Sequence, residues 1–498
     1  MICLAFAGID VGTSGCKMVA YDLEGNVLAS SKREYKEMGT DGHREIDPNL
    51  VWENVQAVIR ETAVNCSEKI EALAIASLGE SIVCLDDKGK VLCNSMITGD
   101  KRGIEECKKL EQVISKEEVM NITGLPLSEM FSLPKFLWMH ENTNIFVKAK
   151  YILFFEDFIG YKLTGNRKIS YSSASRSMAF DIEKKEWSKR LLGYVGIDVE
   201  QLSEPLSPGS IVGKISEEIS EMLMLSDETL VFVGGHDQNC AALGSGVVSG
   251  EQGEDGHGTC EVMLLMLPKI LRTKYMIEND LSCVPYMFPD TYLTLIELTT
   301  CGILMNWCRD TLFDEIRKKC LETGEEFFTH MDSKLSMELQ NLLVLPQFGS
   351  SGNPHINFDT KGLIWGLTIH TTPYEIYQAV KEGMAFQMLL AYETLLPLGI
   401  ETQYICITGG GAASEYTLQM RADIFDKEIV VLENKESGTL GCAIISATAM
   451  NHFASLEDAV EHMVKIKKRF QPNKERHKKY RQQYEKYKKL YELMYDFK

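Results

Sequence analysis

Two aspartates in this chain stand where an apolar run gives way to a turn or a helix. Asp237 comes shortly after the apolar run 230–233, and Asp10 directly follows the run 4–9. Phosphoryl transfer to a hydroxyl requires a base that accepts the alcohol proton, while the rest of its catalysis is positioning and charge neutralisation. Asp237 is the candidate for that base. An aspartate after a strand is also a common helix N-cap, and the local sequence supports the role of base and the role of cap about equally.

The segment 8–17, GIDVGTSGCK, is a candidate phosphate loop. Its glycines allow the backbone to turn tightly and to aim N–H groups at phosphate oxygens, and the hydroxyls of Thr13 and Ser14 add donors. In such a loop Asp10 would hold Mg²⁺ through water, and Lys17 would face the phosphates. An ordinary hairpin turn accounts for the same residues, so this motif alone is weak evidence.

A triple glycine occurs in the segment 408–414, between the apolar run 404–407 and a helical pattern over 415–425. Glycines that open a helix permit close approach by a flat or phosphorylated ligand. Their spacing does not match the dinucleotide fingerprint, so the segment does not indicate an NAD site. A flexible strand–helix turn is the competing interpretation.

Apolar strand patterns alternate with amphipathic helical patterns, which indicates an α/β architecture. The glycine-rich turn expected at 253–259, followed by the apolar run 260–267, repeats the order of the first hairpin and suggests two similar halves. A chain of 498 residues is also too long for one core. We therefore expect two domains, residues 1–245 and 246–498. The other expected strands are 16–22, 27–31, 72–76, 81–86 and 151–155, and helices are expected at 47–62 and 101–114.

The tail from residue 465 onward is rich in Lys, Arg and Tyr. Tyr480, Tyr484, Tyr487 and Tyr491 are spaced i, i+4, i+7 and i+11, so they share one helix face. Basic residues interleaved with aromatics could also indicate an RNA-binding helix. The net charge of the whole chain is −19, which favours a terminal amphipathic helix whose tyrosines pack against the rest of the protein.

The composition limits the kinds of molecule that this protein is expected to bind and the cell compartment in which it is expected to lie. The net charge of −19 argues against nucleic acid, since no general basic field exists to displace counterions from phosphates. The 14 cysteines contain no C-x-x-C pair and fall in apolar runs, which favours free thiols in a reducing compartment. The apolar start is short and lacks a basic flank, so we expect a strand there instead of a signal peptide, and no stretch is long enough to span a membrane. These features predict a cytoplasmic protein.

Taken together, these motifs resemble those of the FGGY carbohydrate kinases. Residues 130–142, MFSLPKFLWMHEN, fit the first signature of that family position by position. The second signature is nearly met by GLIWGL at 362–367 and EIYQAV at 375–380, while Lys381 stands where an apolar residue is usual. The resemblance runs from Ile9 to about Ala443. It implies two ribonuclease-H-like (actin-like ATPase) lobes with an active-site cleft between them, and a requirement for ATP and Mg²⁺.

The resemblance also implies roles for individual residues. Asp237 corresponds to the catalytic base, and Asp10 corresponds to the Mg²⁺-associated carboxylate of the first phosphate turn. The positions implied in ATP binding are Gly12, Thr13, Ser14, Lys17, Gly258, Thr259, Gly302, Asn306, Gly410 and Gly411. Those implied in substrate binding are Glu80, Ser81, Asp100, Asp237 and Gln238.

Residues next to Glu80 separate this chain from two branches of the family. Glycerol kinases carry an arginine where this chain has Gly79, and xylulokinases tend to have Gln-Met-His where it reads Leu-Gly-Glu at 78–80. The hypothesis is an ATP-dependent, xylulokinase-like carbohydrate kinase acting on a small ketose, polyol or sugar acid. The alternatives are a catalytically silent sugar- or nucleotide-binding relative and an ATPase of the same superfamily. Family members are often dimers, so a homodimer is possible.

Overall fold

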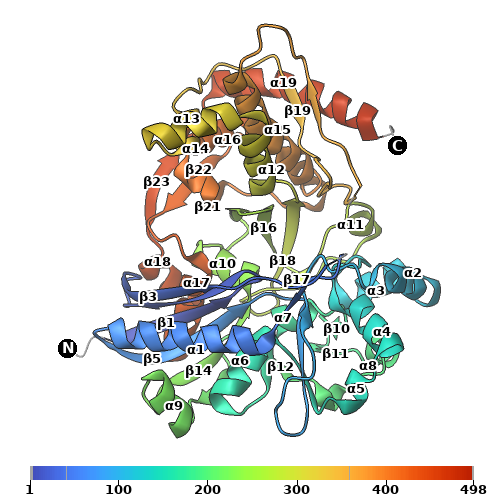
Figure 1. Ribbon diagram of the computed structural model, residues 1–498, viewed down its shortest axis with the longest axis vertical. Coiled ribbons are helices and arrows are strands. Elements are labelled where there is room, and N and C mark those ends of the chain that lie inside the picture. The colour runs from blue at the N-terminus through green and yellow to red at the C-terminus, as the bar shows by residue number, and fades with distance from the viewer. Residues whose placement is uncertain (1–3, 41, 358, 496–498) are drawn as a thin grey trace.

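The computed structural model describes residues 4–40, 42–357 and 359–495, which form two lobes (Figure 1). The first lobe, blue to green in Figure 1, contains a mixed sheet in the strand order β13-β14-β5-β1-β2-β3. Its strands are β1 (Leu4–Val11), β2 (Gly15–Tyr21), β3 (Val27–Glu34), β5 (Lys69–Ser77), β13 (Ile211–Lys214) and β14 (Leu230–His236).

The second lobe, mostly yellow to red, contains a sheet in the order β17-β18-β16-β15-β21-β22-β23. Its strands are β15 (Gln252–His257), β16 (Glu261–Leu267), β17 (Val284–Pro285), β18 (Tyr292–Leu298), β21 (Tyr404–Gly409), β22 (Glu428–Leu432) and β23 (Ile466–Phe470). Short strands outside the two sheets are β4 (Glu45–Ile46), β6 (Ile82–Leu85), β7 (Ser95–Met96), β8 (Tyr151–Phe154), β9 (Lys168–Ser170), β10 (Phe180–Asp181), β11 (Glu186–Trp187), β12 (Glu204–Leu206), β19 (Leu343–Leu345) and β20 (Leu363–Trp365).

Both sheets share one core topology. In each, the first strand (β1 or β15) pairs antiparallel with the next (β2 or β16), which pairs antiparallel with a third (β3 or β18). On its other side the first strand pairs parallel with β5 or β21, and that strand pairs parallel with β14 or β22. The prediction of an α/β protein with two similar lobes is confirmed. Ligands of α/β sheets bind beyond the carboxyl ends of the parallel strands, and β1, β5 and β14 end at one such edge.

Helices cover these sheets and form the walls of the lobes. In the first half of the chain they are α1 (Pro48–Asn65), α2 (Ile104–Val113), α3 (Lys116–Thr123), α4 (Ser132–Asn142), α5 (Ile145–Lys148), α6 (Phe155–Thr164), α7 (Tyr171–Ser175), α8 (Lys189–Gly193), α9 (Glu217–Leu223) and α10 (Asp237–Gly244). In the second half they are α11 (Lys274–Glu278), α12 (Gly302–Trp307), α13 (Asp314–Thr323), α14 (Phe327–Asp332), α15 (Pro373–Glu393), α16 (Glu415–Phe425), α17 (Ser437–Ala449), α18 (Leu456–Met463) and α19 (Lys474–Tyr495).

The two lobes meet where α10 packs against α17. A Cβ on Gly244 would lie 1.9 Å from the carbonyl oxygen of Ser437, and one on Gly441 would lie 2.0 Å from that of Cys240. Glycine at both positions therefore lets the two helices approach backbone to backbone. Helix α17 also packs on β1 and β5, so the later part of the chain returns to the first sheet. The domain division at residue 245 stays a prediction.

The expected helix 415–425 is present as α16, whereas the expected turn 253–259 is wrong over residues 253–257, which belong to strand β15. Charged side chains stand in this strand because each finds a partner, one on the neighbouring strand β21 and one on helix α16. Thr408 Oγ1 donates to Glu254 at 2.6 Å, and Arg421 Nη1 donates to Asp255 at 2.8 Å. The turn itself is shorter, with the N–H of Gly258 donating to the Cys260 carbonyl at 2.9 Å.

The terminal amphipathic helix is confirmed as α19. Tyr480, Tyr484 and Tyr487 are buried, and their rings contact Phe386 of α15. The cysteines of the described ranges are free, as expected. Across these same ranges no helix is long and apolar enough to cross a membrane.

Candidate active site

Asp10 and Asp237 lie at the same edge of the first sheet, Asp10 near the end of β1 and Asp237 just after β14. Both line one cavity of about 440 Å³. The predicted residues Lys17, Gln238, Gly258 and Thr259 line the same cavity. The structure therefore gathers catalytic and phosphate-binding candidates from both lobes around one space.

Lys17 is held between two carboxylates beside this cavity. Its Nζ lies 3.1 Å from Oδ2 of Asp10 and 2.5 Å from Oε2 of Glu436. Burial lowers the pKa of Lys17, but the two carboxylates outweigh it and raise the pKa above its usual value. Lys17 therefore remains a cation next to Asp10.

The turn of Gly12, Thr13 and Ser14 connects β1 to β2. It is closed by the N–H of Gly12, which donates to the Gly15 carbonyl at 2.9 Å, and by Tyr35, whose hydroxyl donates to the Gly12 carbonyl at 2.6 Å. The three turn residues do not line the cavity of Asp10 and Asp237. Their predicted contacts with the γ-phosphate stay a prediction.

The carboxyl group of Asp237 has the acidity of a base that works near neutral pH. Burial raises its pKa, and the negative charges of Asp10 and Glu80 raise it further, to about 7. The side chain is still 29% exposed, which leaves it open to a hydroxyl. Its Oδ1 accepts the N–H of Gln238, the next residue, at 2.6 Å. A helix N-cap accepts N–H groups two or three residues on, so this contact does not have the cap pattern.

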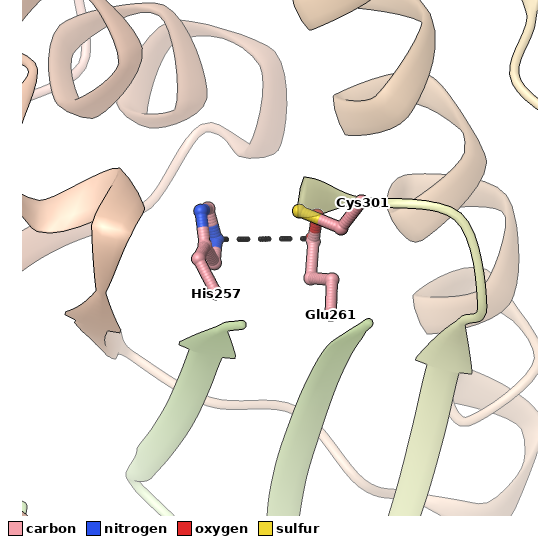
Figure 2. Close-up of side chains that lie close together, drawn as sticks. All are labelled: His257, Glu261 and Cys301. Atoms are coloured by element: carbon pink, nitrogen blue, oxygen red, sulfur yellow. Dashed lines mark ion pairs between the residues drawn. The ribbon is translucent and has the colours of Figure 1, made fainter. Parts of the chain in front are cut away.

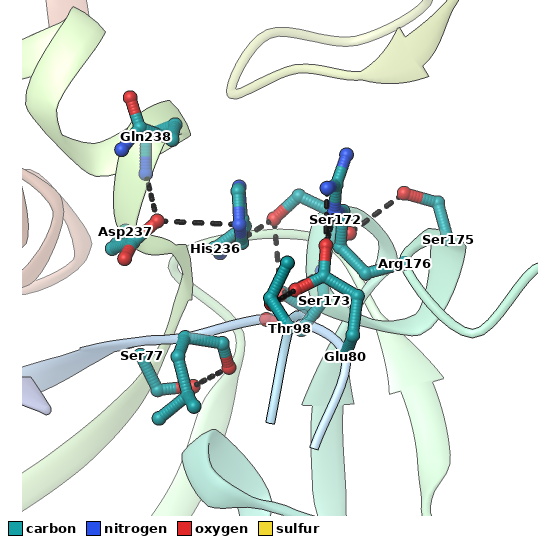
Figure 3. Close-up of polar contacts among 12 residues, drawn as sticks. Ser77, Glu80, Thr98, Ser172, Ser173, Ser175, Arg176, His236, Asp237 and Gln238 are labelled. Carbon is teal, nitrogen blue, oxygen red and sulfur yellow. Dashed lines mark hydrogen bonds and ion pairs between the residues drawn. The ribbon is translucent and has the colours of Figure 1, made fainter. Parts of the chain in front are cut away.

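His236 lies between Asp237 and the Glu80 side chain (Figure 3). Its Nε2 is 3.2 Å from Oδ1 of Asp237, and its backbone N–H donates to Ser172 Oγ at 3.1 Å. Burial and the charge of Arg176 lower the pKa of His236 to about 3. The imidazole is therefore neutral and adds no positive charge beside Asp237.

Glu80 is paired with Arg176, which the sequence did not single out. Arg176 Nε donates to Oε1 of Glu80 at 2.6 Å and its Nη2 contacts the same oxygen, while Thr98 Oγ1 donates to Oε2 at 2.8 Å (Figure 3). Burial alone would raise the pKa of Glu80, but the neighbouring Arg176 guanidinium outweighs it, and the pKa is lowered to about 2. A Cβ on Gly79 would lie 2.6 Å from Cγ of Arg176, so the glycine leaves room for this arginine.

Two other predicted substrate residues have different surroundings. Both oxygens of Asp100 are engaged, because Arg102 donates to Oδ1 and Oδ2 and the N–H of Arg44 donates to Oδ2 at 2.7 Å. Asp100 therefore fixes its own loop in this structure. Ser81 is fully buried, and no partner for its Oγ is present within the described ranges.

A second cavity, of about 610 Å³, lies in the second lobe. It meets the cavity of Asp10 and Asp237 at His257 and Gly258, which line both. The predicted nucleotide residues that line it are Gly258, Gly302, Asn306, Gly410 and Gly411. The two cavities therefore adjoin at His257 and Gly258, which places a nucleotide-sized pocket next to the cavity of the two aspartates.

A buried charge cluster includes His257, which lines both cavities, and Arg421, which lines the second one. Arg421 of α16 lies 2.8 Å from Asp255 and 2.7 Å from Glu261, and His257 lies 3.0 Å from Asp255. His257, Glu261 and Cys301 have ligand atoms within 4.8 Å of one another, close enough to suggest a metal site (Figure 2). Arg421 already supplies the positive charge that Glu261 and Asp255 require, so we assign no metal to this cluster.

Lys381, the departure from the family signature, also lines the nucleotide-sized cavity. Its Nζ lies 2.5 Å from Oδ1 of Asp332 and donates to Ser414 at 3.3 Å and Thr417 at 3.1 Å. No local sequence pattern marks this partner, because Asp332 is on α14 and Lys381 is on α15. The ion pair ties α14 to α15 and α16 at the wall of the cavity.

Comparison with known proteins identifies the family to which this chain belongs. Residues 5–244 match the N-terminal domain and residues 257–450 the C-terminal domain of the FGGY family of carbohydrate kinases. A xylulose kinase of Staphylococcus epidermidis is 29% identical over 481 residues, which cover 95% of this chain and 93% of the relative.

Solved structures agree in fold over the whole length. A ligand-bound xylulose kinase from Lactobacillus acidophilus superposes with a TM-score of 0.89 at 24% identity, covering 99% of this chain and 100% of that one. A gluconate kinase from the same organism gives a TM-score of 0.89 at 24% identity, covering 100% of both chains.

This chain belongs to the FGGY family of carbohydrate kinases. It is an ATP-dependent sugar kinase, and the alternatives of a silent binding relative or a plain ATPase are not favoured.

Proposed function

We propose that the protein transfers the γ-phosphate of ATP to a hydroxyl of a small ketose, polyol or sugar acid, with Asp237 as the base. The observation that carries this proposal is the position of Asp237. It shares one cavity with Asp10 and Lys17, and it stands next to His236 and the Glu80–Arg176 pair. Nucleotide phosphates and a sugar hydroxyl would meet at this point.

The proposed chemistry uses few groups. The Asp237 carboxylate accepts the proton of the substrate hydroxyl, whose oxygen forms a bond to the γ-phosphorus as the bond to the β,γ-bridging oxygen breaks and ADP leaves. Lys17 and the backbone N–H group of Thr259 would neutralise and orient the phosphates. Arg176 and Glu80 would hold the sugar hydroxyls.

The residues at this site fit a magnesium ion. Asp10 and Asp237 offer carboxylate oxygens, which Mg²⁺ prefers, at the cavity expected to receive the phosphates. Asp10 would hold the ion, and bound Mg²⁺ would supply charge neutralisation of the phosphates. A cytoplasmic location and a homodimer stay predictions from the sequence.

The direct test is ADP formation by the purified protein with ATP, Mg²⁺ and a panel of ketoses, polyols and sugar acids. D-Xylulose is the first substrate to try, because relatives at 29% identity are named xylulose kinases. We expect one substrate group to raise ADP formation well above the sugar-free rate. A rate that no sugar in the panel raises would contradict the proposal.

A further inference from the structure

A third cavity, of about 290 Å³, lies between the lobes next to the sugar-binding residues. The first lobe contributes residues 126–131 and Arg176, and the second lobe contributes Ser282, Glu297 and Asn353 among others. Arg176 therefore faces this cavity while it pairs with Glu80. None of the residues expected to bind substrate comes from the second lobe.

Several polar groups of this cavity have no partner of their own. Ser282 is only 5% exposed, and its Oγ has no hydrogen bond within the described ranges. In the same ranges neither an ion pair nor a side-chain hydrogen bond engages the Glu297 carboxylate, and no acceptor is found for Nη1 of Arg176. Buried polar groups are normally hydrogen-bonded, so the unpartnered hydroxyl of the buried Ser282 indicates a polar ligand.

The charges of the cavity are unbalanced. Its lining contains the carboxyl groups of Glu129, Asp280 and Glu297, against one cation, Arg176. The charge of Arg176 is already met by Glu80. The space therefore carries excess negative charge, which suits hydroxyl donors and opposes an anion.

We propose that this cavity receives the end of the sugar remote from the phosphorylated hydroxyl, and that Glu297 selects neutral ketoses or polyols against sugar acids. The inference rests on the proposed function of the site. Glu297 and Ser282 accept hydroxyl hydrogen bonds from the second lobe, and Arg176 donates from the first, so the neutral sugar bridges the two lobes. A substrate carboxylate at the same place would lie against an unpaired Glu297.

The fold alone does not distinguish between a neutral sugar and a sugar acid as substrate. A xylulose kinase and a gluconate kinase superpose equally well on this chain, both with a TM-score of 0.89. The test of the inference is a binding measurement that needs no turnover. Isothermal titration calorimetry would give the dissociation constants of D-xylulose and of the five-carbon acid D-xylonate for the wild type, Glu297→Gln and Ser282→Ala. Asp290→Asn is the matched control, since Asp290 precedes the same strand and its side chain is 84% exposed.

We expect the wild type and Asp290→Asn to bind D-xylulose at least about tenfold more tightly than D-xylonate. Glu297→Gln should bring the two constants closer by about fivefold or more, because it removes the charge and keeps the shape. Ser282→Ala should weaken D-xylulose binding about two- to tenfold without helping the acid.

Equal or tighter binding of D-xylonate by the wild type would overturn the inference, as would an unchanged ratio in a folded Glu297→Gln. If Glu297→Gln does not fold, Ser282→Ala decides the position of the sugar, and unchanged D-xylulose binding would then overturn it. Binding of neither sugar would also overturn it. Binding without ADP formation would leave the cavity assignment standing and contradict only the proposed function.

Discussion

The Nε2 atom of His236 lies 3.2 Å from Oδ1 of Asp237, yet this histidine brings no charge to the aspartate. Burial and Arg176 lower the pKa of His236 to about 3, so it is neutral at physiological pH. Burial, Asp10 and Glu80 meanwhile raise the pKa of Asp237 to about 7. The protonation of Asp237 therefore changes near neutral pH.

The first prediction concerns pH. A base must be deprotonated to act, so kcat/KM should fall as the pH drops through about 7, the pKa of Asp237. The measurement is kcat/KM from about pH 5.5 to about 8.5, with both substrates well below saturation. Glu80→Gln should move the acidic limb to lower pH, because it removes a negative charge that raises the pKa of Asp237. A flat profile below pH 7 would contradict this assignment.

The second prediction concerns the Glu80–Arg176 pair. Glu80→Ala should raise KM for the sugar about ten- to a hundredfold, as expected for losing about 1.5–3 kcal/mol of hydrogen bonding to a charged group. KM for ATP should stay nearly unchanged. Thr98→Val is the matched control, because it removes one hydrogen bond to the other Glu80 oxygen and should have a smaller effect. Equal sugar kinetics for Glu80→Ala and the wild type would remove Glu80 from the site.

The third prediction concerns the ion pair at the nucleotide-sized cavity. The side chains of Lys381 and Asp332 are only 8% and 21% exposed, so Lys381→Met should lower the free energy of unfolding by about 3–5 kcal/mol. Adding Asp332→Asn should recover part of this loss, since no unpaired buried charge remains. Lys318→Met, in a pair whose lysine is 63% exposed, should cost about 1 kcal/mol or less. Urea unfolding measures all four proteins, and similar losses for the two single lysine variants would show that burial of the pair is unimportant.

The fourth prediction is closure of the lobes. The nucleotide-sized cavity lies in the second lobe and the Glu80–Arg176 pair in the first, so both substrates must be brought together and shielded from water. Small-angle scattering should show a smaller radius of gyration when D-xylulose and a non-hydrolysable ATP analogue are both bound. An unchanged radius at concentrations that saturate both sites by calorimetry would contradict closure.

Local pattern was enough to predict the parts of the fold that depend on neighbours in sequence. The buried tyrosine face of α19 follows from helical spacing, and Asp10 and Asp237 follow from apolar strands that end in a carboxylate. The pattern at 253–257 predicts a turn, because glycines and charged residues usually mark loops. Here Glu254 and Asp255 are buried in a strand, where Thr408 and Arg421 bond them.

The rest of the site depends on contacts between distant segments. Arg176 reaches Glu80 across 96 positions of sequence, and no local motif marks it. Arg102 and Arg44 engage both oxygens of Asp100, and the substrate role that the resemblance implies for it stays a prediction. Such pairings are set by tertiary packing, which single-sequence patterns do not contain.

The central claim is that Asp237 is the base, and Asp237→Asn tests it most directly. Asparagine keeps the shape and an oxygen that can accept the N–H of Gln238, but it cannot take a proton. The measurement is kcat for ADP formation with the best sugar at saturating ATP, with Asp290→Asn as the control and with the melting temperature and ATP affinity of each variant. We predict near-normal folding and ATP binding and a kcat lowered about a hundredfold or more. A variant that folds, binds ATP and retains most of the wild-type kcat would contradict the account.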